Sequence, residues 1–288
     1  VYLNMGSDIG VSAVVLTKNE ENNLRYCLHS LEWCDEIIVV DSDSNDSTLD
    51  IARAEGAKVI QENSAEGRFD HLRNFGIKKA TNDWIFVLDA DEICPKELAV
   101  TLLEEAEKEE FDAFNIPRQN YMLDEVKISS IYPDYQTRFH KKSAVDYGEE
   151  LHKFLDVVNG AEIKDFDPEE VEPILHFSVQ SVRDQFDTIN RYSSIRAQNE
   201  SSNYNIFTVF FAAFWDMIYT TGRNFIYKKG YKKPHQTALT VFTSFVAPFM
   251  LYFKKWQIRE KGTEEEVLDK INDIREEEVR KYDEVGLR

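Results

Sequence analysis

The sequence predicts an α/β fold, in which a mostly parallel central sheet is flanked by helices, followed by a helical C-terminal extension. Between residues 11 and 110, short apolar runs alternate with segments of helical spacing, a pattern typical of parallel strands covered on both faces. Short strands with turns follow over residues 111–154, and the chain is mostly helical after residue 181. We therefore expect a disordered end over 1–10, an α/β domain over 11–180 and a helical region over 181–288.

In chain order, strands are expected where apolar and β-branched residues run together, and helices where apolar residues recur three and four positions apart. The expected strands are residues 11–16, 36–40, 58–61 and 84–88. The helices between and after them are 21–31, 47–54, 69–80 and 95–110, the last with Pro95 in its first turn. Residues 206–219 and 239–253 are strongly apolar, and 263–282 is a charged helix with a sparse apolar stripe.

Polar clusters follow three of the expected strands, at residues 17–20, 41–48 and 89–92. Ligands of open parallel sheets bind in the crevice beyond the carboxyl ends of the strands. The three clusters are therefore expected to converge on one site.

Composition restricts the class of partner. The net charge of −19 argues against a nucleic acid, because phosphate backbones require a basic protein surface. Cys27, Cys34 and Cys94 are odd in number and lack metal-ligand spacing. We interpret them as reduced thiols in a reducing compartment.

The strand at 84–88 runs directly into Asp89-Ala90-Asp91-Glu92. Two carboxylates one residue apart at a strand end can hold a hard divalent cation. Such a cation would bridge a diphosphate and neutralise charge on a departing nucleoside diphosphate. The alternative is that Asp89 caps the next helix and Asp91 is solvated, but the other two clusters favour the metal.

The cluster at 41–48 begins with Asp41, which is placed to accept hydrogen bonds from a base or ribose. Asp46 and Ser47 can cap the following helix. An EF-hand is excluded, because Asp46 occupies the position that requires glycine and Ala52 the position that requires glutamate.

Taken together, the segments 14–20, 41–48, 72–74 and 89–92 resemble the family 2 glycosyltransferases. The resemblance is closest to the branch that adds sugars to lipopolysaccharide cores and related bacterial glycans. It implies a GT-A (Rossmann-like) fold, a nucleotide-sugar donor, Mn²⁺ or Mg²⁺ as cofactor, and inversion at the anomeric carbon.

The resemblance also implies site residues. Thr17, Asn19 and Glu20 would line the nucleotide pocket, and Asp41 would bind the base, most often uracil. Asp89, Ala90 and Asp91 would handle the ribose, diphosphate and metal, with Asp91 at the catalytic centre. Arg73 would lie near the donor, where a guanidinium suits phosphate or sugar hydroxyls; an ion pair with a nearby carboxylate is its alternative.

Two later segments carry candidates for a metal ligand and for the general base of the reaction. His176 resembles a late histidine of the family that can complete the metal site, although a histidine between apolar neighbours is often a core residue. An inverting transfer also needs a general base. Where relatives carry Val-His-Glu, this chain has Leu151-His152-Lys153, so we favour Glu150, then Glu149, as the base; a solvated loop is the alternative.

Residues 222–261 are basic and aromatic in an otherwise acidic chain, with nine lysines and arginines against the single acid Glu260. Basic residues beside apolar aromatic helices suit a membrane interface with anionic lipids. The run 239–253 is too short to span a bilayer, which needs about 20 residues. We expect peripheral membrane contact through 206–261; a packed helical subdomain or a homodimer surface is the alternative.

The combined prediction is a metal-dependent hexosyltransferase that uses a UDP-sugar and a lipid-linked or lipopolysaccharide-type glycan, at the cytoplasmic face of a bacterial plasma membrane. A haloacid-dehalogenase-type phosphatase is one rival, because Asp41-Ser42-Asp43 and Asp89-Ala90-Asp91 both follow apolar strands. Its motif, however, usually follows the first strand, which here ends in Thr17-Lys18-Asn19-Glu20. A non-catalytic transferase-fold assembly protein is the second rival, which Lys153 favours and the intact acidic pair disfavours.

Overall fold

The computed structural model describes residues 9–62, 69–127, 132–146, 156–158, 160–199, 205–227 and 229–285. The chain divides into two compact units, Val1–Gln180 and Ser181–Arg288, which are described separately. Of the end predicted to be disordered, residues 1–8 lie outside the described residues, and Ile9 packs against the core of the first unit.

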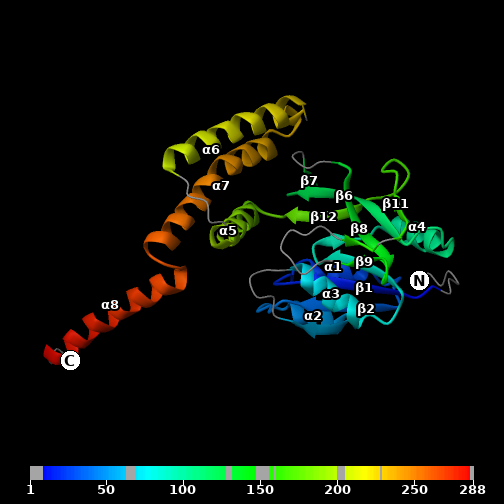
Figure 1. Cartoon of the computed structure of the whole chain (residues 1–288), viewed down its shortest axis with the longest axis horizontal. Helices are drawn as coiled ribbons and strands as arrows, with labels where there is room; N and C mark the ends of the chain where they lie inside the picture. The colour runs from blue at the N-terminus through cyan, green and yellow to red at the C-terminus, as the bar shows by residue number, and fades with distance from the viewer. Residues whose placement is uncertain are drawn as a thin grey trace. The chain divides into compact units, whose positions relative to one another are not determined.

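The first unit is built on a mixed sheet (Figure 1). Its strands are β1 (Val11–Thr17), β2 (Glu36–Asp41), β3 (Lys58–Gln61), β4 (Trp84–Asp89), β5 (Glu92–Ile93), β6 (Ala113–Met122), β7 (Glu125–Val126), β8 (Asp134–Lys141), β11 (Ile163–Asp165) and β12 (Ile174–Val179). The order is β3-β2-β1-β4-β8-β6-β12-β5, with β7 and β11 also paired to β6. Strands β3, β2, β1 and β4 are mutually parallel, whereas β8 is antiparallel to both β4 and β6. Strands β9 (Val145–Asp146) and β10 (Asp156–Val157) form a separate antiparallel pair.

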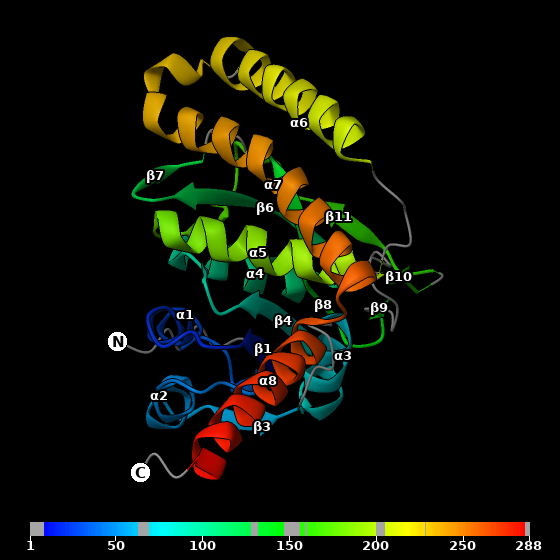
Figure 2. The same cartoon turned by 90° about the vertical axis from the view of Figure 1, so that its left-hand side faces the viewer.

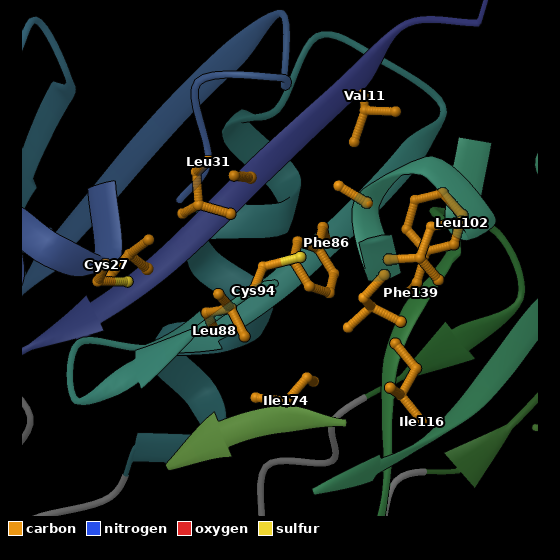
Figure 3. Close-up of a cluster of buried hydrophobic side chains, with 14 of the residues drawn as sticks. Val11, Cys27, Leu31, Phe86, Leu88, Cys94, Leu102, Ile116, Phe139 and Ile174 are labelled. Carbon is orange, nitrogen blue, oxygen red and sulfur yellow. The ribbon is translucent and has the colours of Figure 1, made fainter. Parts of the chain in front are cut away.

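Helices cover both faces of the parallel strands. Successive residues of a strand point to opposite faces of the sheet, so β1 packs against helices on both sides. Val11, Ala13 and Val15 of β1 face α1 (Leu24–His29), α2 (Thr48–Ala54) and α4 (Lys96–Glu107). Val14 and Leu16 face α3 (Phe69–Lys79) instead. Figure 3 shows part of the larger core, where side chains from β1, β4, β8 and α4 meet.

The predicted α/β class, with a mostly parallel sheet between helices and a helical C-terminal extension, is confirmed. Every strand predicted between residues 11 and 88 is present, and β1, β2 and β4 each extend one residue further. Helix α1 is shorter than the predicted 21–31, since the first three residues of that range form a turn closed by Asn23 N donating to Glu20 O at 3.0 Å.

The second unit contains α5 (Val182–Asn199), α6 (Ile206–Thr221), the π-helix η2 (Gly222–Tyr227), the 3₁₀ turn η3 (Gly230–Lys232), α7 (Pro234–Glu260) and α8 (Glu264–Val285). Helices α6 and α7 lie side by side as a hairpin in both views (Figures 1 and 2). The apolar run 239–253 is thus the middle of a 27-residue helix that continues through Pro248. Because of that length and composition, α7 is long enough to cross a membrane, contrary to the expectation from the run alone, but core helices of soluble proteins meet the same test.

Candidate functional site

Strands β1 and β4 lie next to each other at the point where the order of the parallel strands reverses. The chain goes from β1 outward to β2 and β3, then returns to the other side of β1 with β4. Such a reversal leaves a crevice at the carboxyl ends of the strands, where α/β proteins bind ligands. Thr17 pairs with Asp41 and Leu16 with Asp89 in the sheet register, so all three polar clusters end at this crevice.

The loops after β1 and β2 are joined by reciprocal hydrogen bonds. Asn19 N donates to Ser44 Oγ at 2.8 Å, and Asn45 N donates to Asn19 Oδ1 at 2.8 Å. Glu20 N donates to Thr48 Oγ1 at 2.7 Å. Asn19 adopts a φ of 56°, a left-handed conformation that asparagine tolerates better than most residues. These hydrogen bonds therefore hold the two loops together as one wall at the carboxyl end of the sheet.

Asp41 ends β2 as a fully buried carboxylate. Its Oδ2 accepts from Ser44 N at 3.0 Å, and its Oδ1 accepts from Ser44 Oγ. These bonds orient the carboxylate within its own loop. The predicted cap is made by Asp46, whose Oδ1 accepts from Thr48 N at 3.0 Å, whereas Ser47 makes no side-chain cap.

Asp89 lies between two guanidinium groups. Arg73 Nη2 is 2.9 Å from Asp89 Oδ1, and Arg138 Nη2 is 2.6 Å from Asp89 Oδ2. Burial alone would raise the pKa of Asp89, but Arg138 and Arg73 outweigh it and hold that pKa well below its usual range. Arg73 reaches the site because α3 packs closely on the sheet at Gly76, where a Cβ would stand 2.5 Å from Val14 Cγ1.

A second ionic layer lies beneath Asp89. Glu92 is fully buried, and its Oε1 accepts from Arg118 Nη1 at 2.8 Å and from Arg138 Nη2 at 3.1 Å. Its Oε2 accepts from Asp89 N at 3.0 Å. Arg118 also reaches Asp134 Oδ2 at 2.8 Å through Nη2. A buried carboxylate requires such compensation, so Glu92 and the arginines together fix the backbone that carries the acidic pair.

Asp91 faces a different partner. Strand β12 runs antiparallel to β5 with His176 opposite Glu92, and Phe177 N donates to Asp91 O at 3.0 Å. This pairing brings His176 Nε2 to 3.2 Å from Asp91 Oδ2. The two carboxylates of the motif are therefore distinguished by their surroundings, one among arginines and the other beside an imidazole.

The structure thus gathers Thr17, Asn19, Glu20, Asp41, Arg73, Asp89, Ala90, Asp91 and His176 around the carboxyl ends of β1, β2 and β4 and the β5–β12 pair. The alternative for Arg73 is what the structure contains, an ion pair with Asp89. Glu149, Glu150, His152 and Lys153 lie outside the described residues.

Sequence reasoning missed Arg118, Arg138 and the buried role of Glu92. The available signal was weak but present. Arg118 and Arg138 each interrupt a strand-like stretch, and a charged residue in such a stretch needs a buried counter-charge if it points inward. Which carboxylate supplies that charge depends on β8 and β6 lying beside β4 and β12, which the sequence pattern does not specify.

The donor set suits a divalent cation only in part. Within the described ranges, no three His, Cys, Asp or Glu side chains converge as a complete protein metal site. Asp91 and His176 offer one oxygen and one nitrogen, with side chains 25% and 16% exposed. Two protein ligands on a partly open surface fit an ion that takes its remaining ligands from substrate phosphates and water.

The acidic pair and the two polar loops lie at the switch point of the parallel sheet, where α/β proteins bind their ligands. Comparison with known sequences makes the class specific, because the profile of glycosyl transferase family 2 matches residues 12–155. This chain belongs to that family, and the predicted GT-A fold class is confirmed.

Named relatives match only parts of the chain. A glycosyltransferase of Rickettsia felis is 40% identical over 89 residues, 31% of each chain. The glycosyltransferase SunS of Bacillus subtilis is 28% identical over 145 residues, 50% of this chain and 34% of SunS. The crystal structure of residues 1–349 of Staphylococcus aureus TarS in complex with UDP is 16% identical with a TM-score of 0.45, covering 88% of this chain and 92% of that one. The chain spans about a third of the length of these curated relatives.

Proposed function

We propose that this protein is an inverting glycosyltransferase that moves a sugar from a UDP-sugar to a hydroxyl group of a lipid-linked or lipopolysaccharide-type glycan. The observation that carries the proposal is the acidic motif at the switch point, where Asp91 stands 3.2 Å from His176 while two arginines keep Asp89 ionised. Membership of glycosyl transferase family 2 supports the same activity.

The nucleotide would lie against the wall formed by the first two loops. Asp41 is proposed to bind uracil, because a carboxylate accepts the N–H that distinguishes uracil from cytosine. Thr17, Asn19 and Glu20 would line the same pocket. Their loops are already held by hydrogen bonds, so little ordering would be needed on binding, which favours affinity.

The diphosphate would lie between the arginines and the acidic motif. Arg73 is the more exposed of the two guanidinium groups, at 15% against 5% for Arg138. We assign Arg73 to the donor diphosphate, and Arg138 to holding Asp89 in place. Asp91 and His176 would hold Mn²⁺ or Mg²⁺, and Asp89 would reach the ribose or the ion. When bound, the cation would neutralise negative charge on the departing UDP.

The acceptor hydroxyl would lose its proton to Glu150 or Glu149, which remain assigned from sequence alone. Its oxygen would attack the anomeric carbon on the face opposite the diphosphate, forming the new glycosidic bond as the bond to UDP breaks. Attack from that face inverts the configuration.

Titration calorimetry with UDP, GDP, CDP and dTDP, each with and without Mn²⁺, tests the donor assignment. We expect UDP to bind in the presence of Mn²⁺ and CDP not to bind, and Asp91→Ala should abolish the dependence of UDP binding on Mn²⁺ while the protein stays folded. Binding of none of the four to folded protein would refute the proposal. For an active donor and acceptor pair, the anomeric configuration of the product by NMR would decide whether transfer inverts.

The phosphatase is the weaker alternative. Its aspartate must be free to attack a phosphorus atom, but each carboxylate oxygen of Asp89, the first aspartate of the 89–91 motif, is engaged by an arginine. Release of phosphate without sugar transfer would favour it. A non-catalytic assembly role would be favoured if removing the basic helices abolished function and Asp91→Ala did not.

Membrane contact is proposed for the α6–α7 hairpin. Large apolar side chains lie exposed along both helices, including Phe207 (71%), Trp215 (70%) and Phe253 (55%). The loop between the helices and the end of α7 are rich in lysine and arginine, which suits anionic lipids. A lipid-linked acceptor would bring the protein to the cytoplasmic face of the bacterial plasma membrane. Binding to anionic but not to neutral vesicles would support this location, whereas a stable homodimer without vesicle binding would favour dimerisation.

A further inference from the structure

The imidazole of His176 is held by a chain of side-chain contacts that crosses three neighbouring strands, β8, β6 and β12. Arg118 donates to Asp134 Oδ2 through Nη2 at 2.8 Å and through Nε at 3.0 Å. Asn120 Nδ2 donates to the same Oδ2 at 3.0 Å. His176 Nδ1 is 2.5 Å from Asn120 Oδ1, while its Nε2 faces Asp91 Oδ2 at 3.2 Å.

The donor and acceptor roles in this series of hydrogen bonds follow from the carboxylate of Asp134. Burial raises the pKa of Asp134, but hydrogen bonds from Asn120 and Arg118 lower it below its usual value overall, so the carboxylate is ionised and can only accept. Asn120 must therefore turn its amide nitrogen to Asp134 and its oxygen to His176. Because that oxygen can only accept, His176 Nδ1 must carry a hydrogen.

We propose that Asn120, backed by Asp134 and Arg118, is a positioning residue that fixes the Nδ1–H tautomer of His176 and presents Nε2 as a nitrogen ligand for a divalent cation shared with Asp91. In this tautomer of the neutral imidazole, Nε2 carries a lone pair and lies 3.2 Å from Asp91 Oδ2. Neighbouring ligands of an octahedral ion with bonds of about 2.1 Å stand about 3 Å apart. The cation is the one invoked in the proposed function, so the assignment of Nε2 as a metal ligand rests on that function. The tautomer of His176 does not depend on the proposed function.

The arrangement has a consequence for the choice of metal. A fixed imidazole nitrogen suits Mn²⁺ better than Mg²⁺, which prefers oxygen and water. Residues that orient a metal-bound histidine change metal affinity by about 10–100-fold when they are replaced. Asn120 should therefore affect Mn²⁺ binding strongly and Mg²⁺ binding weakly.

The tautomer can be observed directly in the metal-free protein. Long-range ¹H–¹⁵N spectra of histidine-labelled protein at mildly alkaline pH distinguish the two ring nitrogens, and the His176 signal is the one lost in His176→Gln. We expect a protonated Nδ1 and an unprotonated Nε2. A proton on Nε2 in the wild-type protein would overturn the inference. Because no nucleotide is involved, this result is independent of whether UDP binds.

Metal affinity supplies the second measurement, by Mn²⁺ electron paramagnetic resonance without nucleotide. Asn120→Leu should weaken Mn²⁺ binding about tenfold and reduce the preference over Mg²⁺, while Asn115→Leu should not. Asn115 lies on the same strand and also bonds through its amide, but to Asp165 and Thr137. Adding Asn120→Leu to His176→Gln should cause no further loss. An additive loss, or equal effects of the two asparagine variants, would mean that Asn120 acts only on stability.

Discussion

The sheet unit and the helical unit use apolar residues in opposite ways. Every residue of β1 is buried, and the aromatic rings of Trp84, Phe114 and Phe139 pack against one another within the first unit. In α6, by contrast, Phe211 and Trp215 are 69% and 70% exposed. A soluble domain rarely exposes a contiguous apolar surface of this kind unless it binds something. Apolar residues therefore form a core in the sheet unit, and in the helical unit they form the exposed surface proposed for membrane contact.

The largest expected effect is a loss of stability when a buried ring is removed from the core of the sheet unit. Phe139→Ala removes a fully buried ring and should lower the free energy of unfolding by about 3–5 kcal/mol. Phe211→Ala, at an exposed position, should change it by less than about 0.5 kcal/mol. Urea unfolding of both variants measures the difference. Similar losses would mean that the ring of Phe211 is packed in solution.

Replacing an arginine of the ionic layer should have the next largest effect on stability. Arg138→Met leaves Asp89 and Glu92 short of a counter-charge in a buried setting and should cost about 3 kcal/mol. Since the folded-state pKa of Asp89 lies below its unfolded value, its stabilisation is present above the unfolded pKa, about 3.9, and is lost as pH falls through the folded pKa. The wild-type protein should lose stability below about pH 4 more steeply than Arg138→Met, as measured by urea midpoints. Parallel pH profiles would contradict this assignment.

The exposed aromatic residues give a smaller, differently located effect. Trp215→Ala should weaken partitioning into anionic vesicles by about 2 kcal/mol, roughly thirtyfold, because a large apolar side chain no longer enters the lipid. Tyr26→Ala is the matched control, since Tyr26 is 66% exposed in the sheet unit and should leave partitioning unchanged. Flotation with vesicles compares the two variants. Equal losses of partitioning would mean that the α6–α7 hairpin is not the surface that binds the vesicles.

The smallest effect concerns the two hydrogen-bonded loops. Ser44→Ala removes the hydroxyl that bonds Asp41 and Asn19 N and should cost about 1 kcal/mol of stability. If these loops form the nucleotide pocket, UDP affinity should fall about fivefold in the same calorimetric titration. Unchanged UDP affinity would mean that the uracil base does not bind at these loops.

The sequence by itself determined the α/β alternation, the strands from 11 to 88, and the convergence of three polar clusters, because strand periodicity and strand ends are local properties. It also carried the family resemblance. Tertiary structure decided which charges meet: Arg73 and Arg138 come to Asp89 from α3 and β8, and His176 comes to Asp91 through the β12–β5 pairing. It also decided that the apolar run 239–253 continues as a longer helix, α7. Partners brought together by strand order across many residues leave no local pattern, since each contact depends on packing rather than on neighbours in the chain.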